Sequence, residues 1–167
     1  MTSSKPTNVL FLCTHNSARS ILAEGCLNAI GQGAVKGFSA GSSPREHQQP
    51  NPFALAALVS AGMSVDGLHS KSWDAFAKPD APQIDWVITV CDNAANEVCP
   101  VWPGHPASVH WAYPDPSNTQ GSEAQKAAAF DQTLTAIRRR LDLLLIELAA
   151  DGTQAQIKTR LQALVNQ

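Results

Sequence analysis

The sequence predicts an α/β fold, a three-layer sandwich in which a four-stranded, mostly parallel sheet lies between helices. Short apolar runs typical of buried strands alternate along the chain with longer segments of helical spacing. Capping residues delimit several of the helices. At 167 residues with a 44% hydrophobic fraction, the chain is long enough to bury one core. We expect a single domain over 1–167, with its core over about 7–150 and a further helical segment over 153–166.

The first half of the chain supplies two predicted strands and two helices. A continuous apolar run at 7–12 has the pattern of a parallel strand buried on both faces. Helical spacing follows it as far as two closely spaced glycines, which end the helix. A second strand is predicted at 35–41. Asn51 is then a good N-cap, with Pro52 in the first helical position, and Gly62 ends that helix.

The second half supplies two further strands and a long helix. The segments 84–91 and 108–113 are apolar runs of strand length. Ser122 and Gln125 form a capping box ahead of a helix whose apolar residues recur every three or four positions, and Gly152 ends it. A short amphipathic segment completes the chain.

Charge and composition exclude several classes of partner. A net charge of −2 gives no reason to expect nucleic acid or an anionic membrane. The first eight residues are polar, unlike a secretory signal, and the most apolar stretch, at 141–150, is too short to span a bilayer. We therefore expect a cytoplasmic protein, in which the four cysteines are reactive or buried rather than joined in a disulfide framework.

Three residues with chemically active side chains follow predicted strands directly. Cys13 comes after the first strand, Cys91 closes the third, and Asp115 follows the fourth between two prolines. Ligands of parallel α/β sheets bind at the carboxyl ends of the strands. The pattern therefore predicts that these three residues share one site.

The segment CTHNSARS at 13–20 is predicted to bind an oxyanion. It joins a strand end to a helix start, so backbone N–H groups can surround a tetrahedral anion. A left-handed backbone is expected at Asn16. Arg19 can grip the anion with two parallel hydrogen bonds, and Ser20 can donate to the thiolate of Cys13 that this setting favours. The expected oxyanion-binding residues are Thr14, His15, Asn16, Ser17, Ala18, Arg19 and Ser20, with the His15 side chain pointing outward.

Proton transfer and redox chemistry each have candidate residues. Displacement at the centre of the anion needs a general acid, and Asp115 is the best candidate. Cys91 and Cys99 are separated by seven residues without a Cys-His cluster that would complete a zinc site, so we expect no metal and no other cofactor. A redox role needs one thiol to attack the sulfur of Cys13 and another to take over the disulfide. The small polar loop at 93–96 suits such a rearrangement, whereas Cys26 among helix residues is incidental.

Together these motifs resemble those of bacterial arsenate reductases of the low-molecular-weight protein tyrosine phosphatase superfamily, whose fold is flavodoxin-like. The resemblance covers residues 8 to about 148. The superfamily as a whole shares the 13–20 motif, whereas the pair of later cysteines and the HW…DP phrase point to the reductase branch. The motifs are CTHNSARS at 13–20, SAGS at 39–42, TVCDNA at 89–94, Cys99, and HWAYPDPS at 110–117.

The resemblance implies a mechanism and a catalytic set of Cys13, Arg19, Asp115, Cys91 and Cys99. Arsenate would bind in the loop under Arg19, Cys13 would attack arsenic, and Asp115 would protonate the leaving oxygen. Cys91 would then attack Cys13 and release arsenite, and Cys99 would attack Cys91. The resulting disulfide would be reduced by thioredoxin or by glutathione with glutaredoxin, two donors that the sequence leaves open.

The resemblance also implies a cation site. Some relatives hold potassium at positions that correspond to Asn16, Glu24 and Ser39. The acidic partner of that site is replaced here around Lys71-Ser72. We expect an ammonium group to stand in for the ion.

Other functions stay open at this stage. A phosphatase that hydrolyses phosphomonoesters through phosphocysteine would use Cys13, Arg19 and Asp115 unchanged. Against phosphotyrosine, Ser117-Asn118 stand where similar tyrosine phosphatases have aromatic residues that flank the substrate ring. A non-catalytic oxyanion-binding sensor would need neither the acid nor the additional thiols. A Cys–His acyl-transfer enzyme would need a histidine beside the nucleophile, and none of the five has such a context.

Overall fold

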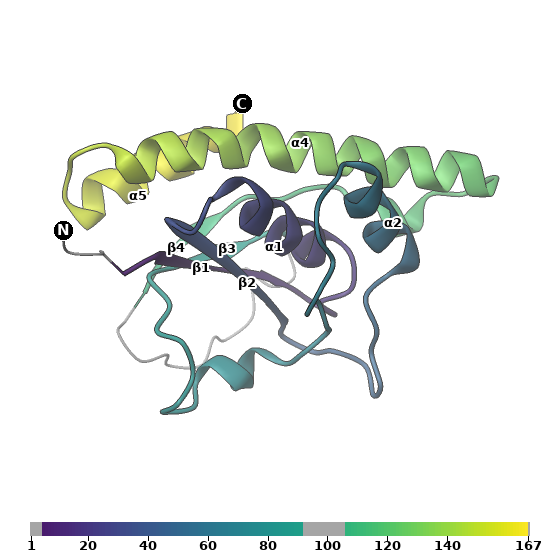
Figure 1. The fold of residues 1–167 in the computed structure, drawn as a ribbon, viewed down its shortest axis with the longest axis horizontal. Coiled ribbons are helices and arrows are strands. Elements are labelled where there is room, and N and C mark those ends of the chain that lie inside the picture. The colour runs from purple at the N-terminus through teal and green to yellow at the C-terminus, as the bar shows by residue number, and fades with distance from the viewer. Residues whose placement is uncertain (1–4, 92–105, 167) are drawn as a thin grey trace.

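The computed structural model describes residues 5–91 and 106–166. Within these ranges, four strands form one sheet in the order β2-β1-β3-β4, and all three strand pairings are parallel (Figure 1). This confirms the predicted α/β class with its four-stranded sheet. The strands are β1 (Thr7–Cys13), β2 (Val35–Gly41), β3 (Trp86–Thr89) and β4 (Ala107–His110).

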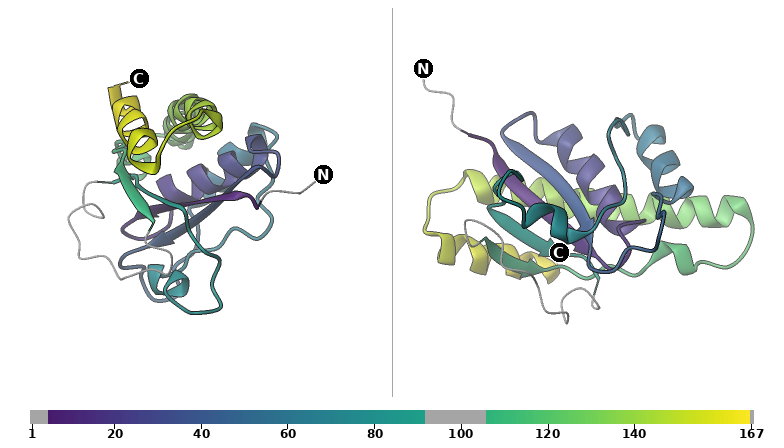
Figure 2. Two further views of the ribbon diagram at one scale, coloured as in Figure 1. Left: turned by 90° about the vertical axis from the view of Figure 1, so that its left-hand side faces the viewer. Right: turned by 90° about the horizontal axis from the view of Figure 1, so that it is seen from below.

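The main helices gather on one side of the sheet. They are α1 (Arg19–Ile30), α2 (Pro52–Ser60) and the 27-residue α4 (Glu123–Ala149), which contact one another. The short 3₁₀ helix η1 (Trp73–Phe76) lies on the opposite face (Figure 2). The apolar residues of β1 and β3 are buried between these layers, as expected for parallel strands covered on both faces.

Two helix starts follow the capping rules. The Asn51 side chain accepts a hydrogen bond of 2.8 Å from the N–H of Phe53 at the start of α2. Ser122 and Gln125 form the reciprocal bonds of a capping box at the start of α4. Both predicted caps are confirmed, and they fix where the chain enters two helices that contact α1.

The third and fourth strands are shorter than the apolar runs 84–91 and 108–113 suggested. The reason for the difference at β4 is that pairing continues past its end as single hydrogen bonds rather than as a ladder. The Trp111 N–H donates to the Thr89 carbonyl at 2.8 Å, and the Tyr113 N–H donates to the Val90 carbonyl at 3.2 Å. The chain therefore follows the edge of the sheet toward Asp115.

The C-terminal segment packs onto its own chain. α5 (Gln154–Ala163) turns back beside α4 and lies against β4, and η3 (Leu164–Asn166) follows it (Figures 1 and 2). The Arg160 Nε donates to the Glu147 Oε2 at 2.6 Å, which joins α5 to the end of α4. Across the described ranges, no helix is both long enough and apolar enough to cross a bilayer.

Candidate active site

The loop between β1 and α1 lies at the carboxyl edge of the sheet, where the sequence placed the site. Asn16 is fully buried with φ of 54°, which confirms the expected left-handed backbone. Gly41, opposite Cys13 in β2, lets this loop pass closely, because a Cβ atom there would lie 2.7 Å from the Thr14 carbonyl oxygen and 2.9 Å from the His15 carbonyl carbon. The backbone of the second strand thus supports the loop from behind.

Cys13 ends β1 with only 4% of its surface exposed. Its Sγ lies 2.8 Å from the Ser20 hydroxyl in the first turn of α1. That hydroxyl accepts a hydrogen bond of 2.8 Å from the Asn16 side-chain amide, so its own proton is directed to the sulfur. The Ser20 hydroxyl is therefore placed to donate a hydrogen bond to the Cys13 sulfur.

Arg19 and Asp115 form the opposite wall of the site. An Arg19 Nη2 nitrogen lies 3.5 Å from the Asp115 Oδ2, and the Nη1 donates to the Tyr113 carbonyl at 2.9 Å. The other carboxylate oxygen of Asp115 accepts from the backbone N–H and the hydroxyl of Ser117, at 2.9 and 2.7 Å. The guanidinium is therefore positioned by its own contacts beside the carboxylate.

These side chains surround a small polar hollow of about 230 Å³. It suits a tetrahedral oxyanion, since two arginines and the inward face of the loop line it. Of the expected oxyanion-binding residues, Asn16 and Ser20 lie behind the loop as its support, and the others line the hollow. The lining residues are Cys13, Thr14, His15, Ser17, Ala18, Arg19, Arg45, Gln48, Asn51, Asp115 and Ser117.

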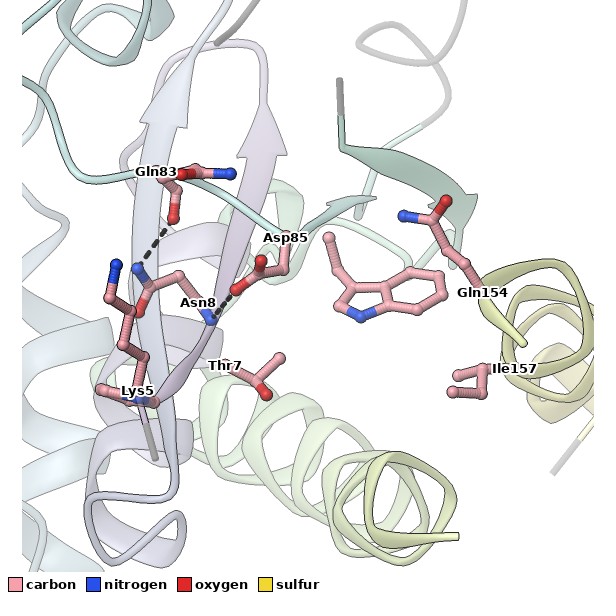
Figure 3. A pocket seen from close by; sticks show the side chains of 9 residues that line it. Lys5, Thr7, Asn8, Gln83, Asp85, Gln154 and Ile157 are labelled. Carbon is pink, nitrogen blue, oxygen red and sulfur yellow. Dashed lines mark hydrogen bonds between the residues drawn. The ribbon is translucent and has the colours of Figure 1, made fainter. Parts of the chain in front are cut away.

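A larger hollow of about 700 Å³ lies at the amino ends of the strands, on the opposite pole of the sheet (Figure 3). Its carboxylate, Asp85, accepts a hydrogen bond of 2.8 Å from the Asn8 N–H, and the Asn8 side chain donates to the Gln83 carbonyl. These groups hold the start of β1, and no thiol is among the described lining residues. The thiol, the arginine and the carboxylate singled out in the sequence lie instead at the smaller hollow.

Cys91 is brought to the same edge. It follows β3, is 3% exposed, and its Sγ lies 3.6 Å from the Thr14 hydroxyl. Cys13 and Asp115 thus line one hollow, and Cys91 lies beside the loop that forms it. Cys99 and the loop 93–96 lie outside the described residues.

Cys26 does not belong to the site. Its side chain is fully buried in α1, and burial raises the pKa of its thiol to about 11. It stays protonated at neutral pH, which agrees with its interpretation as a packing residue. No three His, Cys, Asp or Glu side chains gather as metal ligands in residues 5–91 and 106–166.

A buried charged network supports the loop from below. The Lys71 ammonium donates to the Ser39 carbonyl at 2.9 Å and lies 3.8 Å from the Glu24 Oε1, which accepts from the Ser39 hydroxyl at 2.5 Å. The Lys71 N–H donates to the Asn16 side-chain oxygen at 3.0 Å. Burial raises the pKa of Glu24, against the effect of Ser39 and Lys71, and burial lowers the pKa of Lys71, against the effect of Glu24.

The expected cation position is therefore filled by the chain itself. The ammonium of Lys71 contacts Ser39 and Glu24, two of the three residues assigned to the site. These residues therefore do not fit a potassium ion in addition to the ammonium. The sequence also missed the contributions of Arg45, Gln48 and Asn51 to the hollow. Arg45 and Gln48 follow β2, so the rule that located Cys13 and Asp115 at strand ends was the signal that could have found them.

Comparison with known proteins agrees with this geometry. The family model for low molecular weight phosphotyrosine protein phosphatase matches residues 8–155. An arsenate reductase of Bacillus subtilis (strain 168) is 35% identical over 133 residues, which cover 80% of this chain and 91% of the relative. A solved arsenate reductase in its reduced state superimposes with a TM-score of 0.65 at 26% identity, over 86% of this chain and 99% of that one. The tyrosine phosphatase Wzb from Escherichia coli K30, in complex with sulphate, shares the fold at 18% identity, with a TM-score of 0.66 over 85% and 98% of the two chains.

Proposed function

Because the chain belongs to the low molecular weight phosphotyrosine protein phosphatase family, we propose that it uses the nucleophilic cysteine of that architecture to reduce arsenate to arsenite. The observation that carries the proposal is the second thiol at the oxyanion loop, Cys91, whose Sγ lies 3.6 Å from the Thr14 hydroxyl. Hydrolysis of a phosphoester needs no such thiol. The identity of 35% to an arsenate reductase over most of both chains supports the same choice.

The first step is attack on the bound oxyanion. Arsenate binds in the loop, where backbone N–H groups and Arg19 offset its charge. The thiolate of Cys13, stabilised by the Ser20 hydroxyl 2.8 Å away, attacks arsenic and forms a sulfur–arsenic bond. Asp115, on the opposite wall, gives its proton to the departing oxygen, which leaves as water.

The second step transfers the electrons. Cys91 attacks the sulfur of Cys13, the sulfur–arsenic bond breaks, and its electron pair stays on arsenic, which leaves as arsenite. Two thiols are oxidised to one disulfide while As(V) becomes As(III), so the electrons balance. Cys99 then attacks Cys91, frees Cys13 and presents a Cys91–Cys99 disulfide to the reductant.

The reductant is a dithiol protein of the thioredoxin class or glutathione with glutaredoxin. Both supply the two electrons that each cycle consumes. A protein working this cycle needs a reducing compartment, which agrees with the cytoplasmic location expected from the sequence.

A phosphatase is the second candidate, because Cys13, Arg19 and Asp115 would serve phosphocysteine chemistry unchanged. The hollow favours a small inorganic anion over phosphotyrosine. Its described lining includes no Phe, Tyr or Trp to flank a substrate ring, and Ser117 stands directly after the Asp115-Pro116 pair.

The deciding experiment measures arsenite formation with the thioredoxin and glutaredoxin systems supplied in turn. Reduction is expected with one of them, and Cys91→Ser should abolish turnover while Cys26→Ala, which removes the buried thiol, should not. Absence of arsenite with both systems, together with rapid hydrolysis of aryl phosphate, would assign the chain to the phosphatases instead.

A further inference from the structure

We propose that α5 is a clamp on the outer edge of β4 and that Gln162 within it is a positioning residue for the general acid Asp115. The inference rests on the proposed function for the role of that acid. It concerns a part of the molecule that the family match leaves out, since the match ends at residue 155 and all but the first two residues of α5 lie beyond it.

The outer edge of β4 presents two backbone groups that face away from β3. In the stretch from Ala107 to Trp111, the two end residues donate their N–H groups inward, to the Asp85 and Thr89 carbonyls at 3.3 and 2.8 Å. Because backbone groups alternate in direction along a strand, the N–H and carbonyl of His110 point outward. An edge of this kind is a site of fraying and of pairing with other chains.

Gln162 meets both of these groups with one side chain. Its Oε1 accepts from the His110 N–H at 3.1 Å, and its Nε2 donates to the His110 carbonyl at 2.9 Å. A primary amide has the same donor and acceptor pair as a peptide unit. Gln162 therefore takes the place that a neighbouring strand would occupy beside β4.

Contacts of Trp111 and of Arg140 fix the residues that follow His110. The Trp111 indole N–H donates to the Leu161 carbonyl at 2.8 Å in a buried position. Arg140 of α4 lies over the rings of Trp111 and Tyr113, with its guanidinium carbon 5.5 and 4.7 Å from the ring centroids, and it donates to the Val165 carbonyl at 3.2 Å. The C-terminal segment thus holds this stretch from the side opposite to β3.

The held stretch leads directly into the site. The Tyr113 carbonyl accepts from Arg19 at 2.9 Å, and Asp115, two residues later, lies 3.5 Å from the same guanidinium. A general acid acts only when its proton is within hydrogen-bond reach of the leaving oxygen. A loosened edge at His110 would therefore displace Asp115 relative to Cys13 while leaving the 13–20 loop intact.

The test compares Gln162→Leu with Gln154→Leu. The first removes the paired amide, and the second makes the same change in the first turn of α5, at the opposite pole. For Gln162→Leu we expect kcat for arsenate reduction to fall at least fivefold, the lower limit for the loss of two neutral hydrogen bonds, with phosphate affinity within twofold of wild type. Gln154→Leu should change neither. An unchanged kcat in Gln162→Leu, or an equal loss of kcat and phosphate affinity, would overturn the proposal.

Amide hydrogen exchange provides a second test that does not depend on arsenate turnover. In Gln162→Leu, the Trp111 and Tyr113 amides should exchange at least fivefold faster, while amides of β1 keep the wild-type rate. If wild type reduces no arsenate but this exchange pattern is found, the proposed reaction fails and the clamp stands. If the exchange rates match wild type, the clamp fails whatever the activity.

Discussion

The Lys71–Glu24 pair gives a prediction whose size follows from the structure. Lys71→Met keeps the unbranched apolar part of the side chain and removes the ammonium that lies 3.8 Å from the Glu24 carboxylate. The carboxylate then keeps the Ser39 hydroxyl as its partner but loses its counter-charge. Removing one member of a fully buried pair costs about 3–5 kcal/mol.

The cost here should be smaller, because the two side chains are 17% and 13% exposed and 3.8 Å exceeds a direct hydrogen bond. We expect a loss of about 2 kcal/mol in the free energy of unfolding at neutral pH, equivalent to a fall in Tm of about 4–8 °C for a chain of this length. The double variant Lys71→Met with Glu24→Gln removes the uncompensated charge and should regain most of this loss.

The raised pKa of Glu24 also predicts how the stability loss in Lys71→Met changes with pH. Burial raises the pKa of Glu24 above its ordinary value of 4.5, so its contribution to stability is full below about pH 4.5 and is lost as pH rises through the folded-state pKa. Without the ammonium, the pKa of Glu24 rises further, and the loss toward neutral pH grows. Urea unfolding at pH 5 and pH 7.5 should therefore show a larger deficit for Lys71→Met at the higher pH. An equal deficit at both values, or no recovery in the double variant, would refute this reasoning.

Two further predictions concern the loop itself. Ser20→Ala removes the hydroxyl 2.8 Å from the Cys13 sulfur. Loss of one hydrogen bond to a charged group costs about 1.5–3 kcal/mol and should slow alkylation of that thiol by iodoacetamide at pH 7 by about tenfold or more. An unchanged rate would show that the hydroxyl does not stabilise the anion. Gly41→Ala places a Cβ 2.7 Å from the Thr14 carbonyl oxygen. The resulting backbone shift should cost about 1–3 kcal/mol of stability and weaken phosphate binding at least fivefold. A phosphate titration that gives the wild-type affinity would contradict the close packing described for the loop.

Much of the fold could be predicted because its signals are local. The apolar run of β1, the Asn51 cap and the Ser122–Gln125 capping box each depend on residues within a few positions of one another. The convergence of Cys13 with Asp115 followed from one general rule about parallel sheets. These features needed no knowledge of which strands become neighbours.

The contacts that the sequence did not reveal join distant segments. Gln162 pairs with a backbone group 52 residues away, and nothing in a single glutamine on an amphipathic helix distinguishes it from an exposed one. The Lys71 ammonium was expected near Glu24 through resemblance alone, because the pair is 47 positions apart in the sequence and meets only when α1 and the segment after α2 come together. Side-chain partners of this kind are set by packing rather than by periodicity.

The most direct measurement follows the sulfur atoms through one turnover. A Cys99→Ser variant, fully reduced and mixed with one equivalent of arsenate in the absence of any reductase system, should stop after the first disulfide. Peptide mapping by mass spectrometry should then find Cys13 joined to Cys91, with one arsenite released per chain. Recovery of both thiols in reduced form, or a disulfide that does not include Cys13, would contradict the account.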